Sequence, residues 1–316
     1  MSRAFTVAEA DDGIRLDRWV ARNLPGVPFT AVARWARTGR LRLDGIRVKP
    51  GDRVQAGQVV TLPEEEPRPA PVRPAARPLS AEEADFVRSL VIHRSEHALV
   101  LAKPPGLAVQ GGTRTAVHLD GMLDALRFDA RERPRLVHRL DKDTSGVLLL
   151  ARSARAAAFF GRCFATRDTK KLYLALLVGV PELADMRVDI AIGKQPGSGG
   201  EKMQPDPKGQ SAVSRIRVMD RAGNRVSFCE MRPLTGRTHQ LRVHAAAIGH
   251  PIVGDGKYGG AAAFLTGGIS RKLHLHARRL VIDLPGGGRL DVTAEPPAHF
   301  AESLALLGLA PDAEGA

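Results

Sequence analysis

The chain of 316 residues has few cysteines, few aromatic side chains and no long apolar run. Two cysteines, Cys163 and Cys229, are too few and too isolated for a disulfide framework or a thiolate metal site. Aromatic residues make up 4% of the chain, too little for a broad platform on which single-stranded bases stack. No apolar run reaches the roughly eighteen residues of a membrane span, and the first residues lack a signal-peptide core. We therefore expect a cytoplasmic, reduced protein with no membrane attachment.

Positive charge is abundant. The 47 lysines and arginines exceed the 34 acidic residues, which gives a formal net charge of +13 and a pI near 10.5. Such a balance predicts a polyanionic partner, with RNA and DNA ahead of an anionic membrane. Because stacking side chains are scarce, arginine and backbone contacts to phosphate must dominate a nucleic-acid interface.

The N-terminal sixty residues have the pattern of a small module. Apolar spacing predicts two helices, one from about Ile14 to Leu24 and one from Thr30 to Thr38. Gly39 is a C-cap signal, and an Asp-Gly turn joins two short strand patterns, Leu41–Leu43 and Arg47–Lys49. Val59–Leu62 is expected to close the module.

Basic residues cluster in this module, with seven against two acidic ones between positions 30 and 53. A solvated helix face explains any single arginine, but RNA binding explains the cluster better. The candidate RNA-binding residues here are Arg34, Arg37, Arg40, Arg42, Arg47 and Lys49.

Composition divides the chain into domains. We expect a first domain over residues 1–66, an extended proline- and arginine-rich linker over 67–85, a second domain over 86–305 and a flexible tail over 306–316. Near the end of the linker, Ser80 and Glu83 have the spacing of a capping box that opens a short helix.

The second domain is rich in strand patterns with interspersed helices, which indicates an α+β fold around a mixed, largely antiparallel sheet. The expected helices are Leu119–Leu126, Arg155–Phe164 and His239–Ile248. The expected strands are Ala98–Ala102, Tyr173–Val178 and Val226–Met231, with a hairpin of Leu280–Leu284 and Leu290–Thr293, and Gly193–Gly209 is expected to be a loop.

The nine residues His138–Gly146 form an acidic turn before the apolar run Val147–Ala151. Asp141 and Asp143 stand among cationic neighbours, and a turn lets their side chains diverge. An ionised carboxylate at the end of a buried strand can act as a nucleophile or general base, or it can merely cap the strand. The turn alone leaves both interpretations open.

A second polar segment spans Arg232–His244. Its Thr235-Gly236 turn leads toward a helix start, where free backbone N–H groups and Arg237 predict a phosphate cradle. His239 and His244 have no carboxylate or thiolate at ligand spacing, so we expect no metal site.

Three segments, in this order along the chain, resemble the RluA-type pseudouridine synthases: His138–Gly146, Lys171–Ala175 and Thr235–His244. Leu101–Val109 and Gly249–Ile252 match the flanking patterns of the family. The resemblance covers about two thirds of the chain.

The N-terminal module resembles the S4 RNA-binding domain, through Arg15–Asp17 and the hairpin Leu43–Pro50. An S4-like domain before such a catalytic domain is typical of the bacterial large-subunit ribosomal RNA enzymes of the RluC and RluD types. Gly26–Pro28 and Arg47–Pro50 look more like the RluC type.

This resemblance implies that specific uridines of 23S ribosomal RNA are isomerised to pseudouridine without a metal or organic cofactor. It implies that Asp141 is the catalytic aspartate and that Arg242 pairs with it. Tyr173 would pack on the target base and help remove the C5 proton, and Arg139 would enter the RNA helix as the base leaves. Gln110 stands where the family often has histidine, which puts a proton-transfer role for that site in doubt.

Three alternatives remain at this point. The enzyme could be RluD-like, or it could modify transfer RNA. The same basic surface could also belong to a non-catalytic ribosome-assembly factor, although pure binding needs no such carboxylate. We expect a monomer that acts on ribosomal RNA or a large-subunit precursor.

Overall fold

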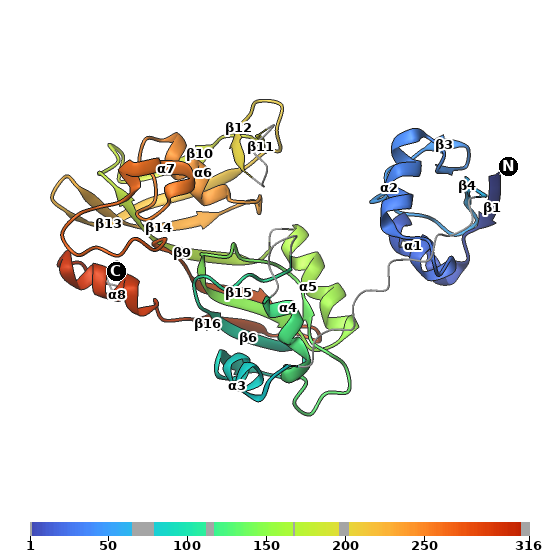
Figure 1. The fold of residues 1–316 in the computed structure, drawn as a ribbon, viewed down its shortest axis with the longest axis horizontal. Helices are drawn as coiled ribbons and strands as arrows, with labels where there is room; N and C mark the ends of the chain where they lie inside the picture. The colour runs from blue at the N-terminus through green and yellow to red at the C-terminus, as the bar shows by residue number, and fades with distance from the viewer. Residues whose placement is uncertain (1, 65–78, 112–116, 167, 196–201, 311–316) are drawn as a thin grey trace. The chain divides into compact units, whose positions relative to one another are not determined.

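The computed structural model describes residues 2–64, 79–111, 117–166, 168–195 and 202–310. Contacts between residues divide the chain into two compact units, 1–78 and 79–316 (Figure 1). Each unit has its own buried core and is described separately below.

The N-terminal unit packs two helices, α1 (Leu16–Asn23) and α2 (Phe29–Thr38), on a four-stranded sheet. Both tryptophans of the chain, Trp19 and Trp35, are buried in its core. Gly39 ends α2 with φ 72°, which confirms the predicted C-cap. The sheet order is β1-β4-β2-β3, with β1 at Ser2–Thr6, β4 at Val59–Pro63, β2 at Arg42–Leu43 and β3 at Ile46–Arg47.

The expected limits of the linker and the tail need correction. Helix α3 (Ala81–Ser89) begins inside the expected linker 67–85. The predicted capping box of Ser80 and Glu83 caps the N-terminus of this helix, which packs within the second unit. In the expected tail, Leu309 is buried beside Phe300. Residues 65–78 and 311–316 of these two segments lie outside the described residues.

A ten-stranded sheet forms the second unit, and the expected mixed, largely antiparallel arrangement is confirmed. Strands β8 and β15 pair in parallel, whereas the other pairs of this sheet are antiparallel. The order is β10 (Asp185–Asp189), β13 (Val213–Ala222), β14 (Val226–Pro233), β9 (Lys170–Val178), β15 (Leu275–Asp283), β8 (Ser145–Ala151), β6 (Ala98–Lys103) and β5 (Val91–Arg94). The short strand β7 (Arg135–Leu136) pairs with β8, and β16 (Arg289–Thr293) forms the predicted hairpin with β15.

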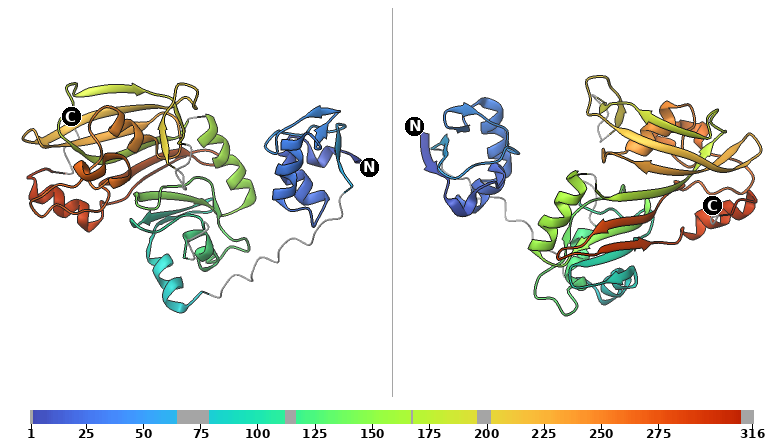
Figure 2. Two further views of the ribbon diagram at one scale, coloured as in Figure 1. Left: turned by 45° about the horizontal axis from the view of Figure 1, so that its top comes forward. Right: turned by 180° about the vertical axis from the view of Figure 1, so that it is seen from behind.

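Helices cover both faces of this sheet, which explains why the central strands β6 and β8 are apolar without alternation (Figures 1 and 2). Around β6 and β8, one face packs against α3, α4 (Leu119–Met122) and the 3-10 helix η2 (Leu123–Leu126). The opposite face packs against α5 (Ala154–Thr166). Around β9 and β14, α6 (Gln240–Ala247) covers one face and α8 (Ala298–Leu306) the other.

Some elements differ from expectation. The expected loop Gly193–Gly209 contains a small antiparallel pair, β11 (Ile192–Lys194) with β12 (Met203–Pro205). Strand β13 was not predicted, because arginines and an aspartate on its exposed face interrupt the apolar pattern. No helix of the described ranges combines the length and apolarity needed to cross a bilayer.

A close approach of two strands fixes the acidic turn. Gly146 in β8 adopts φ 112°, and a Cβ atom there would overlap the carbonyl of Ala277 in β15. Only glycine permits this backbone conformation and contact. The parallel pairing of β8 and β15 begins at this point, so it places the turn 138–144 beside the centre of the sheet.

Candidate active site

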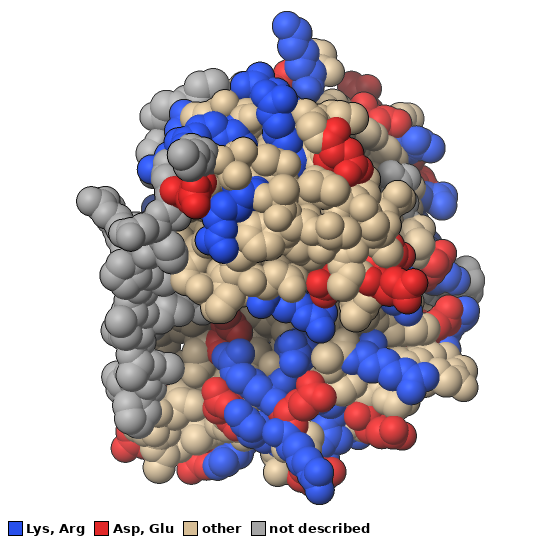
Figure 3. Space-filling view, turned by 90° about the vertical axis from the view of Figure 1, so that its right-hand side faces the viewer, with Lys and Arg blue, Asp and Glu red and all other residues tan. Residues whose placement is uncertain are grey.

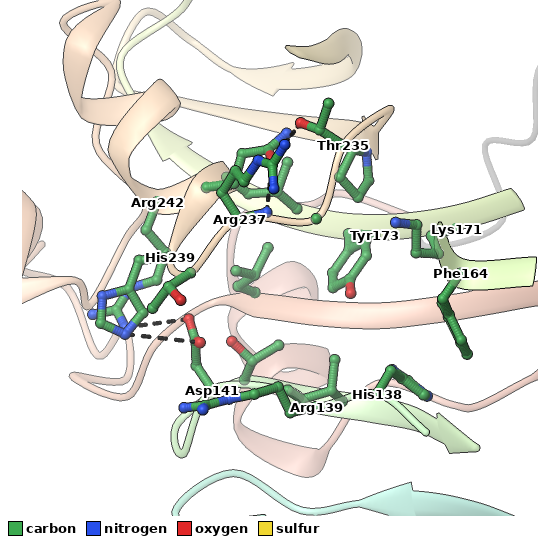
Figure 4. A pocket seen from close by; sticks show the side chains of 18 residues that line it. His138, Arg139, Asp141, Phe164, Lys171, Tyr173, Thr235, Arg237, His239 and Arg242 are labelled. Carbon is green, nitrogen blue, oxygen red and sulfur yellow. Dashed lines mark hydrogen bonds and ion pairs between the residues drawn. The ribbon is translucent and has the colours of Figure 1, made fainter. Parts of the chain in front are cut away.

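Segments far apart in the sequence line one cavity of about 290 Å³ (Figure 4). The turn before β8 contributes Asp141 and Arg139, and β9 contributes Lys171 and Tyr173. The segment from Pro233 to Arg242, after β14, supplies most of the remaining lining. The structure therefore brings the three resembling segments to one place.

Asp141 lies between two cationic or hydrogen-bond-donating side chains. Its Oδ2 is 3.6 Å from Arg242 Nη1, and its Oδ1 is 3.7 Å from His239 Nε2. Its side chain is 19% exposed, so it remains accessible from the cavity. Asp143 is exposed and lines an adjacent hollow instead, so the two carboxylates diverge as expected.

Arg242 is buried and is held mainly by a second carboxylate. Its Nε and Nη2 each donate a hydrogen bond of 2.8 Å to Asp255, whose side chain is fully buried. Burial alone would lower the pKa of Arg242, but the hydrogen bonds and negative charge of Asp255 raise it, so the guanidinium stays charged. The guanidinium carbon also lies 5.1 Å from the ring centre of Tyr258.

Tyr173 forms part of the cavity floor on β9. Burial raises the pKa of its phenol, and the negative charge of Asp141 raises it further. The phenol is therefore neutral near pH 7. Beside it, burial lowers the pKa of Lys171.

His138 supports the wall of the cavity. Its Nε2 accepts a hydrogen bond of 2.8 Å from the Leu149 backbone N–H, and its ring stacks on Phe164 at 4.5 Å. Burial lowers the pKa of His138 to about 3, with a smaller contribution from the charge of Lys171. This histidine is therefore neutral and anchors the turn to β8.

One backbone amide of the expected phosphate cradle at Thr235–Thr238 is already bonded within the protein. Helix α6 begins only at Gln240, and the Arg237 backbone N–H donates to the buried Gln240 side chain at 3.0 Å. The Gln240 amide also donates to the Val213 carbonyl and to Ser214 Oγ, both at 2.9 Å. The Arg237 side chain lines the cavity, and its Nε donates to the Ser211 carbonyl. The Gln240 side-chain oxygen therefore occupies the Arg237 backbone N–H, which is not available to an anion.

Sequence reasoning missed Asp255 and Lys103. Lys103 is 1% exposed, and its Nζ donates to the carbonyls of Pro104, Leu107 and Lys142, which ties the turn 138–144 to the end of β6. Burial lowers the pKa of Lys103 to about 8. A lone lysine or aspartate in a glycine- or proline-rich segment carries no signal of such tertiary contacts.

The other histidines of the motif segments have structural partners. His244 contacts Ser214 Oγ and the Ile190 carbonyl, each at 3.0 Å, and His250 contacts the Val178 carbonyl at 2.9 Å. Within the described ranges, no three histidine, cysteine or acidic side chains gather in a way that could hold a metal ion.

In the N-terminal unit, the six candidate RNA-binding residues are all exposed: Arg34, Arg37, Arg40, Arg42, Arg47 and Lys49. Arg34 and Arg37 share one face of α2. Arg42 also donates to the carbonyls of Gly39 and Gly45, so it braces the hairpin as well. Lysine and arginine side chains gather in patches on the face of the molecule drawn in Figure 3.

Comparison with known proteins agrees with this architecture. The profile of the RNA pseudouridylate synthase family matches residues 97–247, and that of the S4 domain matches residues 14–60. The chain is 34% identical to ribosomal large subunit pseudouridine synthase C of Salmonella typhimurium, over 91% of each protein. It is 32% identical to mitochondrial RNA pseudouridine synthase 4 of Arabidopsis thaliana, over 86% of this chain and 71% of the relative.

Solved structures support the same assignment. Human RNA pseudouridylate synthase domain containing 4 superposes with a TM-score of 0.62 at 29% identity, over 72% of this chain and 97% of that one. Human RNA pseudouridylate synthase domain containing 1 superposes with a TM-score of 0.55 at 32% identity, over 66% and 83%. The chain belongs to the RNA pseudouridine synthase family, in its RluA-type branch, and carries an N-terminal S4 domain.

Proposed function

We propose that this enzyme isomerises specific uridines of the large-subunit (23S) ribosomal RNA to pseudouridine, as an RluC-like synthase. The names of the bacterial relatives, which match over most of both chains, support this substrate class. The S4 domain and the net charge of +13 support binding to a large, folded RNA.

The observation that carries the proposal is the position of Asp141. Its carboxylate borders the same cavity as Tyr173, and each of its oxygens faces one donor. A carboxylate placed in this way can attack or deprotonate the ribose of a bound uridine. The N1–C1′ bond breaks and the uracil rotates; C5 then bonds to C1′ as any Asp141–C1′ bond breaks, or as a proton taken from the ribose returns to it, and the C5 proton is lost as N1 gains one.

Arg242 Nη1 lies 3.6 Å from Asp141 Oδ2, so its positive charge attracts the carboxylate and helps to orient it. Tyr173 packs on the target base. Since its pKa is raised, its neutral phenol is a weak base, and the site supports the packing role rather than removal of the C5 proton.

The target uridine must leave its stack to reach Asp141, at a cost of a few kcal/mol. Arg139, at the mouth of the cavity, is positioned to enter the space that the base vacates. Arg237 and the exposed basic residues of the N-terminal unit supply contacts to phosphate, which offset the cost of unstacking.

We further propose that the enzyme acts as a cytoplasmic monomer without a cofactor. The two cysteines are buried and unpaired, as in proteins of reducing compartments.

The test compares Asp141→Asn with the matched variant Asp143→Asn on 23S ribosomal RNA fragments. We expect Asp141→Asn to abolish pseudouridine formation, detected as carbodiimide-adduct stops in primer extension, while RNA affinity stays within a few fold. Asp143→Asn should keep most of the activity, because its carboxylate lies outside the cavity. Substantial activity of Asp141→Asn would contradict the mechanism, and an inactive wild-type enzyme on all large-subunit fragments would contradict the substrate. Adduct mapping in a knockout strain would identify the modified uridines.

A further inference from the structure

We propose that His239 is a hydrogen-bond donor to Asp141 and that Tyr258 holds it in the tautomer that carries its proton on Nε2. The inference rests on the proposed role of Asp141 and extends it to residues with no assigned function in the site.

The imidazole of His239 lies between a carboxylate and a phenol. Its Nε2 is 3.7 Å from Asp141 Oδ1, and its Nδ1 is 2.6 Å from the Tyr258 hydroxyl oxygen. The histidine lines the catalytic cavity and also the hollow on the other side of Asp141. It therefore stands against the reacting carboxylate on one edge and against a fixed side chain on the other.

The hydrogen bonds of Tyr258 determine which ring nitrogen carries the proton. The Tyr258 hydroxyl oxygen accepts a hydrogen bond of 3.1 Å from the Met203 backbone N–H, which can only donate. Within the described part of the chain, its other hydrogen-bonding neighbour is His239 Nδ1. The phenolic proton therefore goes to Nδ1, and a neutral imidazole that accepts at Nδ1 carries its own proton on Nε2. That N–H is directed toward Asp141.

The surroundings of His239 favour this neutral form. Burial lowers the pKa of His239, and the positive charges of Arg242 and Lys257 lower it further. The negative charges of Asp141 and Asp255 act in the opposite direction, but the pKa remains below its usual range. Burial also raises the pKa of Tyr258, so its phenol retains the proton that it donates.

The backbone of His239 provides an independent sign of a functional constraint. The residue caps α6 in the left-handed region, with φ 54° and ψ 19°, and makes no side-chain capping bond to the helix. Such a conformation is uncommon for a residue other than glycine, and it persists where other contacts determine it. Here the side chain is fixed by Tyr258 and faces Asp141 instead of the helix end.

Together, His239 and Arg242 place one donor at each oxygen of Asp141. Both separations are longer than a hydrogen bond, as is common in sites without bound substrate, where such contacts shorten on binding. The pair would fix the plane of the carboxylate before it meets the ribose.

The primary test is the ring ¹⁵N spectrum of the full-length protein labelled at histidine, with His239→Asn used for assignment because asparagine tolerates this backbone conformation. At neutral pH we expect a protonated Nε2 and an unprotonated Nδ1 for His239. Tyr258→Phe should remove this preference and raise the pKa of His239, because Nδ1 loses its donor. A protonated Nδ1 in the wild-type protein, or an unchanged spectrum in Tyr258→Phe, would overturn the proposal.

Activity gives a second readout. Tyr258→Phe keeps the ring beneath Arg242, and we expect kcat to fall about tenfold with KM for RNA within about twofold. The kcat of His239→Asn should be lower than that of Tyr258→Phe. In His239→Gln the amide nitrogen can reach the Nε2 position, so its kcat should be higher than that of His239→Asn. Equal kcat values for the Asn and Gln variants would contradict the donor role. The nitrogen spectrum does not depend on turnover, so it tests His239 even if Asp141→Asn contradicts the proposed function.

Discussion

Arg242 is bound more closely to Asp255 than to Asp141. Two of its nitrogens lie 2.8 Å from the Asp255 oxygens, whereas Nη1 is 3.6 Å from Asp141. Asp255 also accepts hydrogen bonds from the backbone N–H groups of Lys257 and Tyr258 at the start of α7 (Gly256–Gly259). The position of the Arg242 guanidinium is therefore set mainly by Asp255 and not by Asp141.

Asp255→Asn should reduce both stability and turnover. Removal of one partner from a buried ion pair leaves the other charge uncompensated, and typically costs about 3 to 5 kcal/mol of the free energy of unfolding. Urea denaturation measures this loss. Asp143→Asn, which changes an exposed carboxylate near the same site, should stay within about 0.5 kcal/mol. Similar losses of unfolding free energy for the two variants would show that the Arg242–Asp255 pair contributes no more to stability than an exposed carboxylate.

Deletion of residues 1–66 should weaken RNA binding while leaving the chemistry intact. The N-terminal unit carries the exposed basic cluster, and each lost phosphate contact reduces the slope of log K against log salt by about 1. Filter binding at several salt concentrations checks this expectation, and single-turnover assays at saturating enzyme check the chemistry. The charge variants Arg37→Ala and Lys49→Ala should show smaller changes in the same direction, whereas Arg187→Ala, on β10 of the other unit, serves as a control. An unchanged salt slope in the deletion variant would contradict the RNA-binding role of this unit.

Stability should fall as the pH decreases from 7.5 to 5.5. Burial lowers the pKa values of His274 and His276 to about 4, against about 6.5 in an unfolded chain. Below pH 6.5 the unfolded state therefore binds protons that the folded state does not, until the pH approaches 4. The two neutral histidines therefore stabilise the fold fully above pH 6.5. By pH 5.5 the contribution of each histidine to the free energy of unfolding should have fallen by about 1 kcal/mol.

Urea denaturation at pH 7.5, 6.5 and 5.5 measures this dependence in a range where most carboxylates remain ionised. His274→Gln should be less stable overall, because its ring hydrogen-bonds Ser303, but it should show a shallower pH dependence. A pH-independent free energy of unfolding for the wild-type protein would contradict the buried, neutral state of these histidines.

Gly146→Ala should destabilise the catalytic unit by about 3 kcal/mol or more, because the new methyl group would overlap the Ala277 carbonyl and the backbone has a positive φ. Gly223→Ala is a matched control. Gly223 also has a positive φ, 57°, but no atom lies within 4 Å of its added Cβ, so its cost should be about 1 kcal/mol. Thermal unfolding gives the change in melting temperature for each variant. Equal changes would show that the close contact between β8 and β15 does not determine the cost of a side chain at position 146.

The sequence predicted which residues line the cavity better than it predicted the residues that hold them in place. Asp141, Tyr173 and Arg242 were expected together because each belongs to a motif with recognisable spacing, and the structure brings them to one cavity. Asp255 was not expected, since its partner Arg242 lies thirteen residues away and only tertiary packing joins them. The hydrogen bond from the Arg237 backbone N–H to the buried Gln240 side chain was not expected for the same reason.

Secondary structure followed a similar rule. The turn at Asp44-Gly45, the C-cap at Gly39 and the capping box at Ser80 were predicted correctly, because each depends on local chemistry. Strand β13 and helix α8 were missed, since their places depend on the sheet that they join. The second unit begins at Leu79, earlier than expected, and helix α3 packs in its core through Val87, which composition does not report.

Strand β9, which carries Tyr173, pairs with β14 on one side and β15 on the other. A strand paired along both edges opens only with the loss of much of the surrounding sheet, so its backbone amides should be among the slowest of the chain to exchange with deuterium. The part of the cavity wall that β9 forms should therefore stay fixed on the timescale of turnover. We therefore expect the larger movement in each turnover to be made by the RNA. The ease with which a given uridine unstacks should then help to determine which uridines are modified.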